Sequence, residues 1–159
     1  MSLPVGVVTL AERYGGTVVS QDIYDAMVKE VAGFVQAFAA SHRGDLAGYH
    51  MLGTSGTVTT IAGVFLKLKR YDRRRVDGCW LSDEEVSRVV AELIAMNFDQ
   101  RAANPCIGAE RADLVLAGCA ILDAIRQFFP CGRLRVADRG LREGMLVEMM
   151  RANGVWGEA

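Results

Sequence analysis

Two segments of this chain share one pattern, in which a short apolar run leads through a glycine turn into apolar residues at helical spacing. The first begins with Tyr49–Leu52 and turns at Gly53–Gly56, and the second begins with Leu134–Val136 and turns at Asp138–Gly140. Strands that alternate with helices are typical of an α/β fold. We therefore predict an α/β protein, and open α/β sheets place their ligands at the carboxyl ends of parallel strands.

Length and composition indicate the number of domains and exclude some classes of binding partner. A chain of 159 residues suggests one domain, and 51% hydrophobic residues allow a packed core. The formal net charge is -1, so there is no global basic field to hold a nucleic acid or an anionic membrane. We expect neither partner, and any anion site must be local.

The sequence favours the cytoplasm. Its N-terminus lacks the basic start and long apolar run of a secretory signal, and no segment approaches the roughly 20 apolar residues that a spanning helix needs. The spacing of Cys79, Cys106, Cys119 and Cys131 matches neither a CxxC redox pair nor a zinc ribbon. Reduced thiols fit a cytoplasmic protein.

Other segments supply further expected elements. Alternation around Gly6 predicts a short strand near Val5–Thr9, and helical spacing predicts a helix from Ser20 to Gly44. A capping box at Ser82 predicts another helix, and a third is expected from Ala109 until Pro130. Between them, residues 67–81 are rich in Lys and Arg. We expect an exposed, solvated loop there, although an anionic polymer would also be attracted to it.

The turn Gly53-Thr54-Ser55-Gly56-Thr57 is the most informative candidate site. Glycines let a backbone approach a phosphate closely, and the helix that follows points unpaired N–H groups at the anion. The turn matches neither a Walker A loop nor a GxGxxG fingerprint. From these five residues alone, a tight turn with a Ser or Thr cap is the favoured explanation.

Three arginines are weaker candidates. Arg139 and Arg142 lie at the second turn, where they would face a polyanion, and Arg111 precedes the predicted helix that ends at Pro130. A structural explanation competes in each case. The second turn, with Arg139 and Arg142, can simply begin a helix whose dipole favours Glu143 in its first turn, and Arg111 fits a surface ion pair. His42 and His50 are too few and too poorly placed for a metal site or a catalytic triad, and we interpret both as structural or surface residues.

Four blocks of the sequence form a recognisable set: Leu3–Tyr14, Gly53–Ala62, Arg111-Ala112-Asp113 with Gly118 and Ile121-Leu122, and Gly140–Gly144. Together they resemble the exopolyphosphatase and guanosine pentaphosphate phosphohydrolase (Ppx/GppA) family. The blocks occur in family order and at family spacing, and the likeness covers nearly the whole chain.

The resemblance implies a ribonuclease H-like fold of the actin-like ATPase type, in which two domains close on a phosphate-bearing ligand. Family members cleave terminal phosphoanhydride bonds of polyphosphate or guanosine pentaphosphate with Mg2+, by in-line attack of water on phosphorus. The implied partners are therefore polyphosphate or guanosine penta- or tetraphosphate. The implied phosphate-binding or nucleotide-binding residues are Gly53, Thr54, Ser55, Gly56, Thr57, Arg111 and Arg142.

Only the C-terminal part of the family's second domain has a counterpart here, so residues 1–159 are expected to form a partial C-terminal ribonuclease H-like domain. The family's first domain carries the carboxylate thought to activate water. Its second domain opens with an acidic loop of the type Asp-x-Gly-Gly-Gly-Ser. Neither occurs in this sequence. We therefore expect no catalytic residue and no magnesium ligand in this chain, and little activity from it alone.

The family's strand order implies a truncated sheet. The third strand would lie near Val5–Thr9, the fourth near Tyr49–Leu52 and the fifth near Leu134–Ala137, whereas the first and second are absent. Because the first strand normally lies between the third and the fourth, both would have unpaired edges. We expect a homo-oligomer, a strand swap or a rearranged sheet to fill this gap.

Three functions remain open at this point. In the first, the chain supplies the back wall of the cleft of a phosphohydrolase. In the second, it is a non-catalytic module for alarmone binding or oligomerisation, which the missing acidic loop favours. In the third, it has a kinase-like nucleotide site, which the block Gly140–Gly144 makes less attractive.

Overall fold

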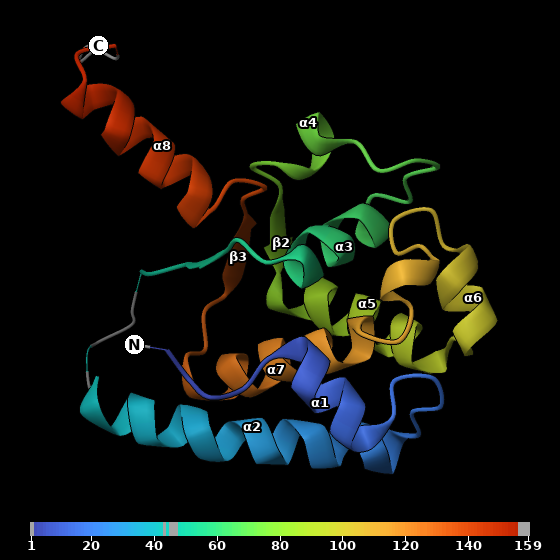
Figure 1. Cartoon of the computed structure of the whole chain (residues 1–159). Helices are drawn as coiled ribbons and strands as arrows, with labels where there is room; N and C mark the ends of the chain where they lie inside the picture. The colour runs from blue at the N-terminus through green and yellow to red at the C-terminus, as the bar shows by residue number, and fades with distance from the viewer. Residues whose placement is uncertain (1, 43, 45–47, 156–159) are drawn as a thin grey trace.

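The computed structural model describes residues 2–42, 44 and 48–155. Helices form most of the protein, and a small sheet lies among them (Figure 1). The α-helices are α1 (Val7–Tyr14), α2 (Gln21–Ser41), α3 (Gly56–Phe65), α4 (Arg73–Val76), α5 (Asp83–Ala95), α6 (Phe98–Ala103), α7 (Val115–Phe128) and α8 (Leu141–Ala152), and Ala109–Arg111 form a 3-10 helix, η1.

The sheet has three strands, β1 (Met51–Gly53), β2 (Trp80–Ser82) and β3 (Arg133–Val136), in the order β1-β3-β2. β1 runs parallel to β3, with Leu52 opposite Arg135, whereas β2 runs antiparallel to β3. The two segments that share a strand-turn-helix pattern are therefore adjacent, and their carboxyl ends lie side by side. This confirms the predicted α/β class, and the strands predicted at Tyr49–Leu52 and Leu134–Val136 are observed at Met51–Gly53 and Arg133–Val136.

The packing of α2 on α7 forms much of the core (Figure 1). α2 begins as predicted, because the Ser20 hydroxyl accepts a hydrogen bond from the Ile23 N–H at 3.3 Å. Tyr24 is buried on the inner face of α2, and its hydroxyl donates to Asp123 of α7 at 2.7 Å. Burial is the main reason why the pKa of Tyr24 lies far above its usual value. The bond therefore joins a neutral phenol to a carboxylate.

The predicted strand near Val5–Thr9 is wrong, because α1 begins at Val7. The Gly6 N–H donates to the Thr9 hydroxyl at 3.3 Å, and that hydroxyl donates to the Gly6 carbonyl at 3.0 Å, so these local bonds start a helix. Leu10 and Ala11 are buried where α1 packs on α7, whereas Val8 is exposed. Helical spacing thus prevailed over an alternation only a few residues long.

The predicted loop over residues 67–81 is also only partly right. α4 lies within it, and the Asp72 carboxylate caps this helix by accepting from the Arg74 N–H at 2.9 Å. β2 begins at its end, and Leu68 and Val76 are buried. The cationic side chains are exposed, as expected: Lys67, Lys69, Arg70, Arg73, Arg74 and Arg75.

Helix α5 has the predicted capping box, since the Ser82 N–H donates to the Glu85 carboxylate at 2.7 Å and the Glu85 N–H donates to the Ser82 hydroxyl at 3.2 Å. The helix expected from Ala109 begins later, at Val115, because residues 109–111 form the short turn η1 after Gly108 at φ 76°. Arg111 therefore lies at the end of this short 3-10 helix and precedes α7.

Helix α8 differs from the others because none of its residues is buried. It projects away from the body of the molecule (Figure 1). Its exposed apolar side chains are Leu141, Met145, Leu146 and Met149. No helix within the described ranges has the length and apolar character that crossing a membrane requires.

Candidate phosphate-binding site

A cavity of about 660 Å³ opens at the carboxyl ends of β1 and β3. Its walls come from three segments far apart in the sequence: residues 54–59 at the start of α3, residues 105–111 before α7, and residues 138–143 at the start of α8. Tyr71 completes the lining. The fold therefore brings the two predicted glycine turns to one cavity, as the parallel pairing of β1 with β3 requires.

The first turn presents the N-terminus of α3 to this cavity. The Ser55 hydroxyl accepts from the Val58 N–H at 3.3 Å, and the Thr59 hydroxyl donates to the Gly56 carbonyl at 3.0 Å. These bonds fix the first turn of a helix of 10 residues. The positive end of its dipole and its unpaired N–H groups favour an anion there.

Arg111 lies directly against this helix start. A Cβ placed on Gly56 would be 3.5 Å from the Arg111 Nη1 atom, an ordinary van der Waals contact. The side chain of Arg111 is exposed, and no hydrogen bond or ion pair joins its guanidinium to another described residue. A charged fork beside a helix N-terminus suits the planar oxygens of a phosphate group.

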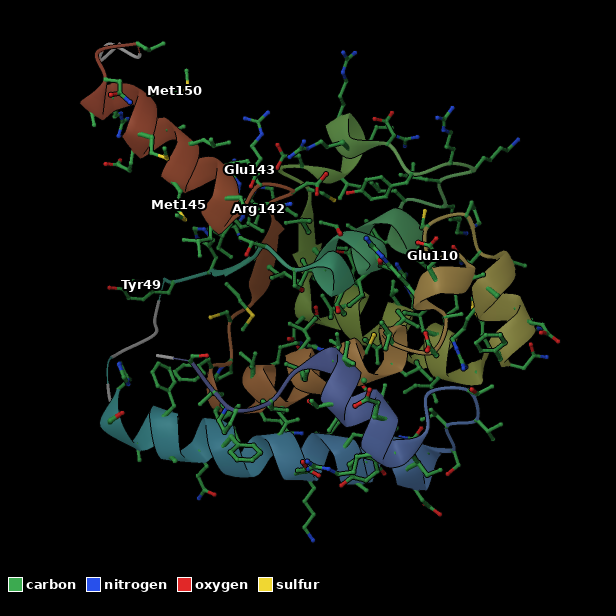
Figure 2. The ribbon with its side chains drawn as sticks, in the orientation of Figure 1. Tyr49, Glu110, Arg142, Glu143, Met145 and Met150 are labelled. Atoms are coloured by element: carbon green, nitrogen blue, oxygen red, sulfur yellow. The ribbon has the colours of Figure 1, made fainter. Side chains whose placement is uncertain are left out.

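Two further arginines enter the cavity wall from the second turn. Arg142 belongs to the first turn of α8, and within the described part of the chain its guanidinium has no ion-pair partner. Arg139 has one, because its Nε lies 3.7 Å from the Asp77 carboxylate. Figure 2 shows Arg142 beside Glu143 at the end of α8 that faces the body. Arg111 and Arg142 therefore provide the less neutralised positive charge.

Both carboxylates of the cavity are already occupied. Glu143 accepts from the Gly140 N–H at 2.8 Å. This backbone bond, helped by nearby Arg142, lowers the pKa of Glu143 below its usual range. Asp138 pairs with Arg73, whose Nε lies 3.1 Å from its carboxylate. Each acidic group therefore serves local structure.

The seven predicted site residues divide into two groups. Thr54, Ser55, Gly56, Arg111 and Arg142 line the cavity together. Gly53 instead lies inside the fold, where a Cβ would be 2.8 Å from Val58, and its carbonyl accepts from the Ala137 N–H at 2.9 Å. Thr57 packs on α7, because a Cβ on Gly118 would lie 2.1 Å from its hydroxyl. Gly53 and Thr57 thus pack against the protein interior and support the turn without lining the cavity.

Sequence reasoning missed two parts of the wall. Tyr71 lies in the segment expected to be a loop, and burial raises its pKa, with neighbouring Asp138 adding to the effect. The other part is Cys106–Gly108, which follows the predicted break at Asn104-Pro105. That break was the only sequence signal for this segment, and it indicated a loop without indicating where the loop packs.

The residues of this cavity do not fit a magnesium site of the protein's own. Mg²⁺ is held by carboxylates and water together with substrate phosphates. Glu143 and Asp138 make the bonds given above, and the described ranges contain no group of three or more His, Cys, Asp or Glu side chains that is suited to a metal ion. No reaction step is therefore assigned to a metal held by this chain.

Comparison with known proteins identifies relatives. The sequence model of the Ppx/GppA phosphatase family matches residues 1–153. No curated protein matches the sequence. Among solved structures, the Ppx/GppA family member of Aquifex aeolicus has a TM-score of 0.76 at 26% identity, and an exopolyphosphatase-like protein has a TM-score of 0.78 at 25% identity. An exopolyphosphatase of Cytophaga hutchinsonii shares the fold, with a TM-score of 0.76 at 19% identity.

These alignments cover nearly all of this chain but only about half of each neighbour. They cover 96%, 96% and 98% of this chain, but 49%, 51% and 50% of the respective neighbours. The chain thus spans about half the length of each solved structure that it matches.

Proposed function

Because the chain belongs to the Ppx/GppA phosphatase family, we propose that it forms the C-terminal part of a phosphohydrolase and supplies one wall of its phosphate cleft. The substrate would be inorganic polyphosphate or guanosine pentaphosphate, whose terminal phosphate is released. The observation that carries this proposal is the position of the Arg111 guanidinium beside Gly56, at the N-terminus of α3, in a cavity that Arg142 also lines.

The proposed fold is the truncated ribonuclease H-like, actin-like ATPase type. β1 and β3 would be its fourth and fifth strands, which the parallel pairing of neighbours supports. β2 is an addition on the far side of β3. The segment expected to be the third strand is the start of α1, so the proposal assigns only two of the five strands of the superfold to this chain.

The proposed chemistry divides the work between this wall and the rest of the enzyme. The N–H groups of α3 and the guanidiniums of Arg111 and Arg142 would bind phosphate oxygens and stabilise negative charge during attack by water. The base that the family resemblance implies is a carboxylate that is free to accept a proton from water. The bonds of Glu143 to Gly140 and of Asp138 to Arg73 make both unsuitable. The base and the Mg²⁺ ligands of the proposed reaction would therefore lie outside this chain.

Calorimetric titration with inorganic tripolyphosphate tests the binding role. We expect Arg111→Gln to weaken binding by roughly tenfold or more, because one charge-assisted hydrogen bond contributes about 1.5–3 kcal/mol. Arg74→Gln is the matched control, since Arg74 is also exposed but lies on α4, outside the cavity lining. Equal affinity in the wild type and Arg111→Gln would refute the assigned site.

Phosphate release tests the division of labour. We expect the chain alone, with magnesium, to release no more phosphate from polyphosphate or guanosine pentaphosphate than its Gly56→Val variant, whose side chain crowds the helix start. Release clearly above that variant would mean that a base lies in this chain after all.

A non-catalytic binding module is the second candidate. The engagement of both cavity carboxylates favours it for the isolated chain. Tight binding of guanosine pentaphosphate or tetraphosphate, with preference over tripolyphosphate and without release, would favour this alarmone-binding role. Equal binding of all three ligands would favour the phosphohydrolase wall.

A further inference from the structure

A cationic segment, residues 67–75, runs from the end of α3 into α4, and the proposed phosphate wall gives its charges no role. It holds one acidic side chain, Asp72, whose carboxylate caps α4. Its six cationic side chains are all exposed: Lys67, Lys69, Arg70, Arg73, Arg74 and Arg75. Of these six, only Arg73 has an ion-pair partner among the described residues. The segment therefore presents a local excess of positive charge to solvent.

Three contacts fix this segment beside the candidate phosphate-binding cavity. Tyr71 forms part of the cavity wall. The Cys106 thiol, which also lines the cavity, donates to the Leu68 carbonyl at 3.7 Å. The Arg73 Nε lies 3.1 Å from the carboxylate of Asp138, another lining residue. The exposed cations consequently belong to a stretch of backbone that is anchored to the cavity.

A second hollow, of about 720 Å³, continues from the cavity towards this segment. Arg139 and Glu143 line both spaces, and Arg73 lines the hollow only. The other acidic residue of the hollow, Glu148, is paired with Arg151 at 3.1 Å. Figure 1 shows α4 on the opposite side of the molecule from α2. A ligand that extends out of the cavity through this hollow therefore reaches the cationic segment.

Lys67 occupies a position that glycine would fill more easily. Its backbone has φ 50°, in the left-handed region where helices usually end with glycine. The Lys67 N–H donates to the Val64 carbonyl at 2.9 Å, and the Leu68 N–H donates to the Gly63 carbonyl at 3.2 Å, so these bonds close the end of α3. A lysine destabilises such a turn relative to glycine, while it adds an exposed cation to the segment.

We propose that the cationic segment is a second contact for a linear polyphosphate chain whose end occupies the cavity. This inference rests on the proposed function, and it names the polymer rather than the alarmone as the substrate class. Every phosphate along a linear polyphosphate is negatively charged, so the part of the chain outside the cavity is attracted to cations beside it. The nucleoside part of guanosine pentaphosphate is uncharged and has no such attraction.

A single-stranded nucleic acid fits the segment less well than polyphosphate does. Proteins that bind such strands combine cations with aromatic side chains on which the bases stack. The one aromatic residue of the segment, Tyr71, lies in the cavity wall rather than among the exposed cations. The segment thus offers charge without a stacking surface, which matches a polyanion that has no bases.

Calorimetric titration of the full chain with long-chain polyphosphate and with tripolyphosphate tests the proposal. Lys69→Gln/Arg70→Gln removes two cations of the segment and keeps the pair of Arg73 with Asp138. We expect it to weaken long-chain binding roughly fivefold or more, because each exposed ion pair contributes modestly. The slope of log affinity against log salt should become shallower by about 1.4, or about 0.7 for each lost contact. Tripolyphosphate affinity should not change.

Arg13→Gln/Lys29→Gln is the matched control. It removes the same charge at exposed positions on α1 and α2, outside the cavity lining. Circular dichroism and the unfolding midpoint establish that both double variants fold. Arg74→Gln, the control for tripolyphosphate, should weaken long-chain binding alone.

Lys67→Gly separates the proposed role from a structural one. Glycine suits the left-handed backbone at this position, so the unfolding midpoint of this variant should rise or stay the same. Its affinity for long-chain polyphosphate should nevertheless fall, with a salt slope that is shallower by about 0.7. A variant that is at least as stable as the wild type but binds the polymer less tightly is not explained by damage to the fold.

Three results would overturn the proposal. The first is a long-chain affinity that falls no further in Lys69→Gln/Arg70→Gln than in the control. The second is an equal loss of tripolyphosphate affinity, because the segment would then act within the cavity. The third is an oligonucleotide of matched charge that binds as tightly as polyphosphate and loses the same affinity. The proposed function fails separately, when Arg111→Gln leaves tripolyphosphate affinity unchanged, so the two failures are distinguishable.

Discussion

Arg101 offers the sharpest test of what holds the candidate site in place. Only 1% of this residue is exposed, and its guanidinium faces backbone carbonyls rather than a carboxylate. Its Nε donates to Ala112 at 2.9 Å and its Nη1 to Met96 at 2.6 Å. Its Nη2 donates to Gly16 at 3.1 Å and to Thr17 at 2.9 Å. One side chain thus ties the α1–α2 connection and the end of α5 to the loop that carries Arg111.

The cost of replacing it can be worked out from these four bonds. Hydrogen bonds to a charged group contribute about 1.5–3 kcal/mol each. The gross gain is offset by several kcal/mol for burying the charge, and burial does lower the pKa of Arg101. Methionine fills most of the volume without a charge, but it leaves four carbonyls without their donor. We expect Arg101→Met to lower the free energy of unfolding by about 3 kcal/mol.

Urea titration of the wild type and Arg101→Met measures this loss, and the thermal midpoint should fall by about 6–12 °C in a domain of this size. Arg101→Lys is the control, because it keeps the charge but lacks the planar fork that reaches four acceptors. It should recover only part of the loss. Tripolyphosphate affinity should fall as well, since Ala112 adjoins Arg111. A loss below about 1 kcal/mol in Arg101→Met would refute the reasoning.

Three further predictions concern the turns around the site. Gly118→Ala places a Cβ against Thr57 and should lower the free energy of unfolding by about 2 kcal/mol in urea titration. Adding Thr57→Ala should recover part of that loss, and a double variant as unstable as Gly118→Ala alone would contradict this contact. Ser55→Ala removes the cap of α3 and should cost about 1 kcal/mol by the same assay; an unchanged midpoint would contradict it. The folded pKa of Glu143 is lowered, so its stabilisation of α8 is complete above its usual pKa of about 4.3 and is lost as the pH falls through the lowered value. Hydrogen exchange at Gly140 should therefore quicken in acid relative to neighbouring amides, and Glu143→Gln should remove that change.

Sequence reasoning succeeded where the signal was local. Ser20 and Ser82 were identified as caps, and both accept the expected backbone bonds. The turn at Gly53–Gly56 was also placed correctly, because a glycine turn between an apolar run and a helical stripe has few alternatives.

Failures arose where the decisive partner is distant in sequence. The segment around Val7 reads as a strand in isolation, but Leu10 and Ala11 pack on α7, a hundred or so residues later. Similarly, nothing near Arg101 in the sequence indicates that it binds Gly16. For the site, Arg111 and Arg142 were weak candidates from the residues alone, and the family resemblance added to their case, whereas Tyr71 lay in a stretch whose charges predicted only solvent exposure. Tertiary context decides such positions.

The order of strands in the sheet has a consequence for how the protein forms during synthesis. β1 and β2 each pair with β3 and not with each other, so the last of these three described strands to be synthesised is the central one. α2 must likewise wait for α7, its main partner. Until residues up to Val136 have emerged, β1 and β2 therefore stay unpaired and the apolar face of α2 stays uncovered. During that interval apolar surface on the nascent chain is exposed, and exposed surface of this kind makes an incompletely folded chain prone to aggregate.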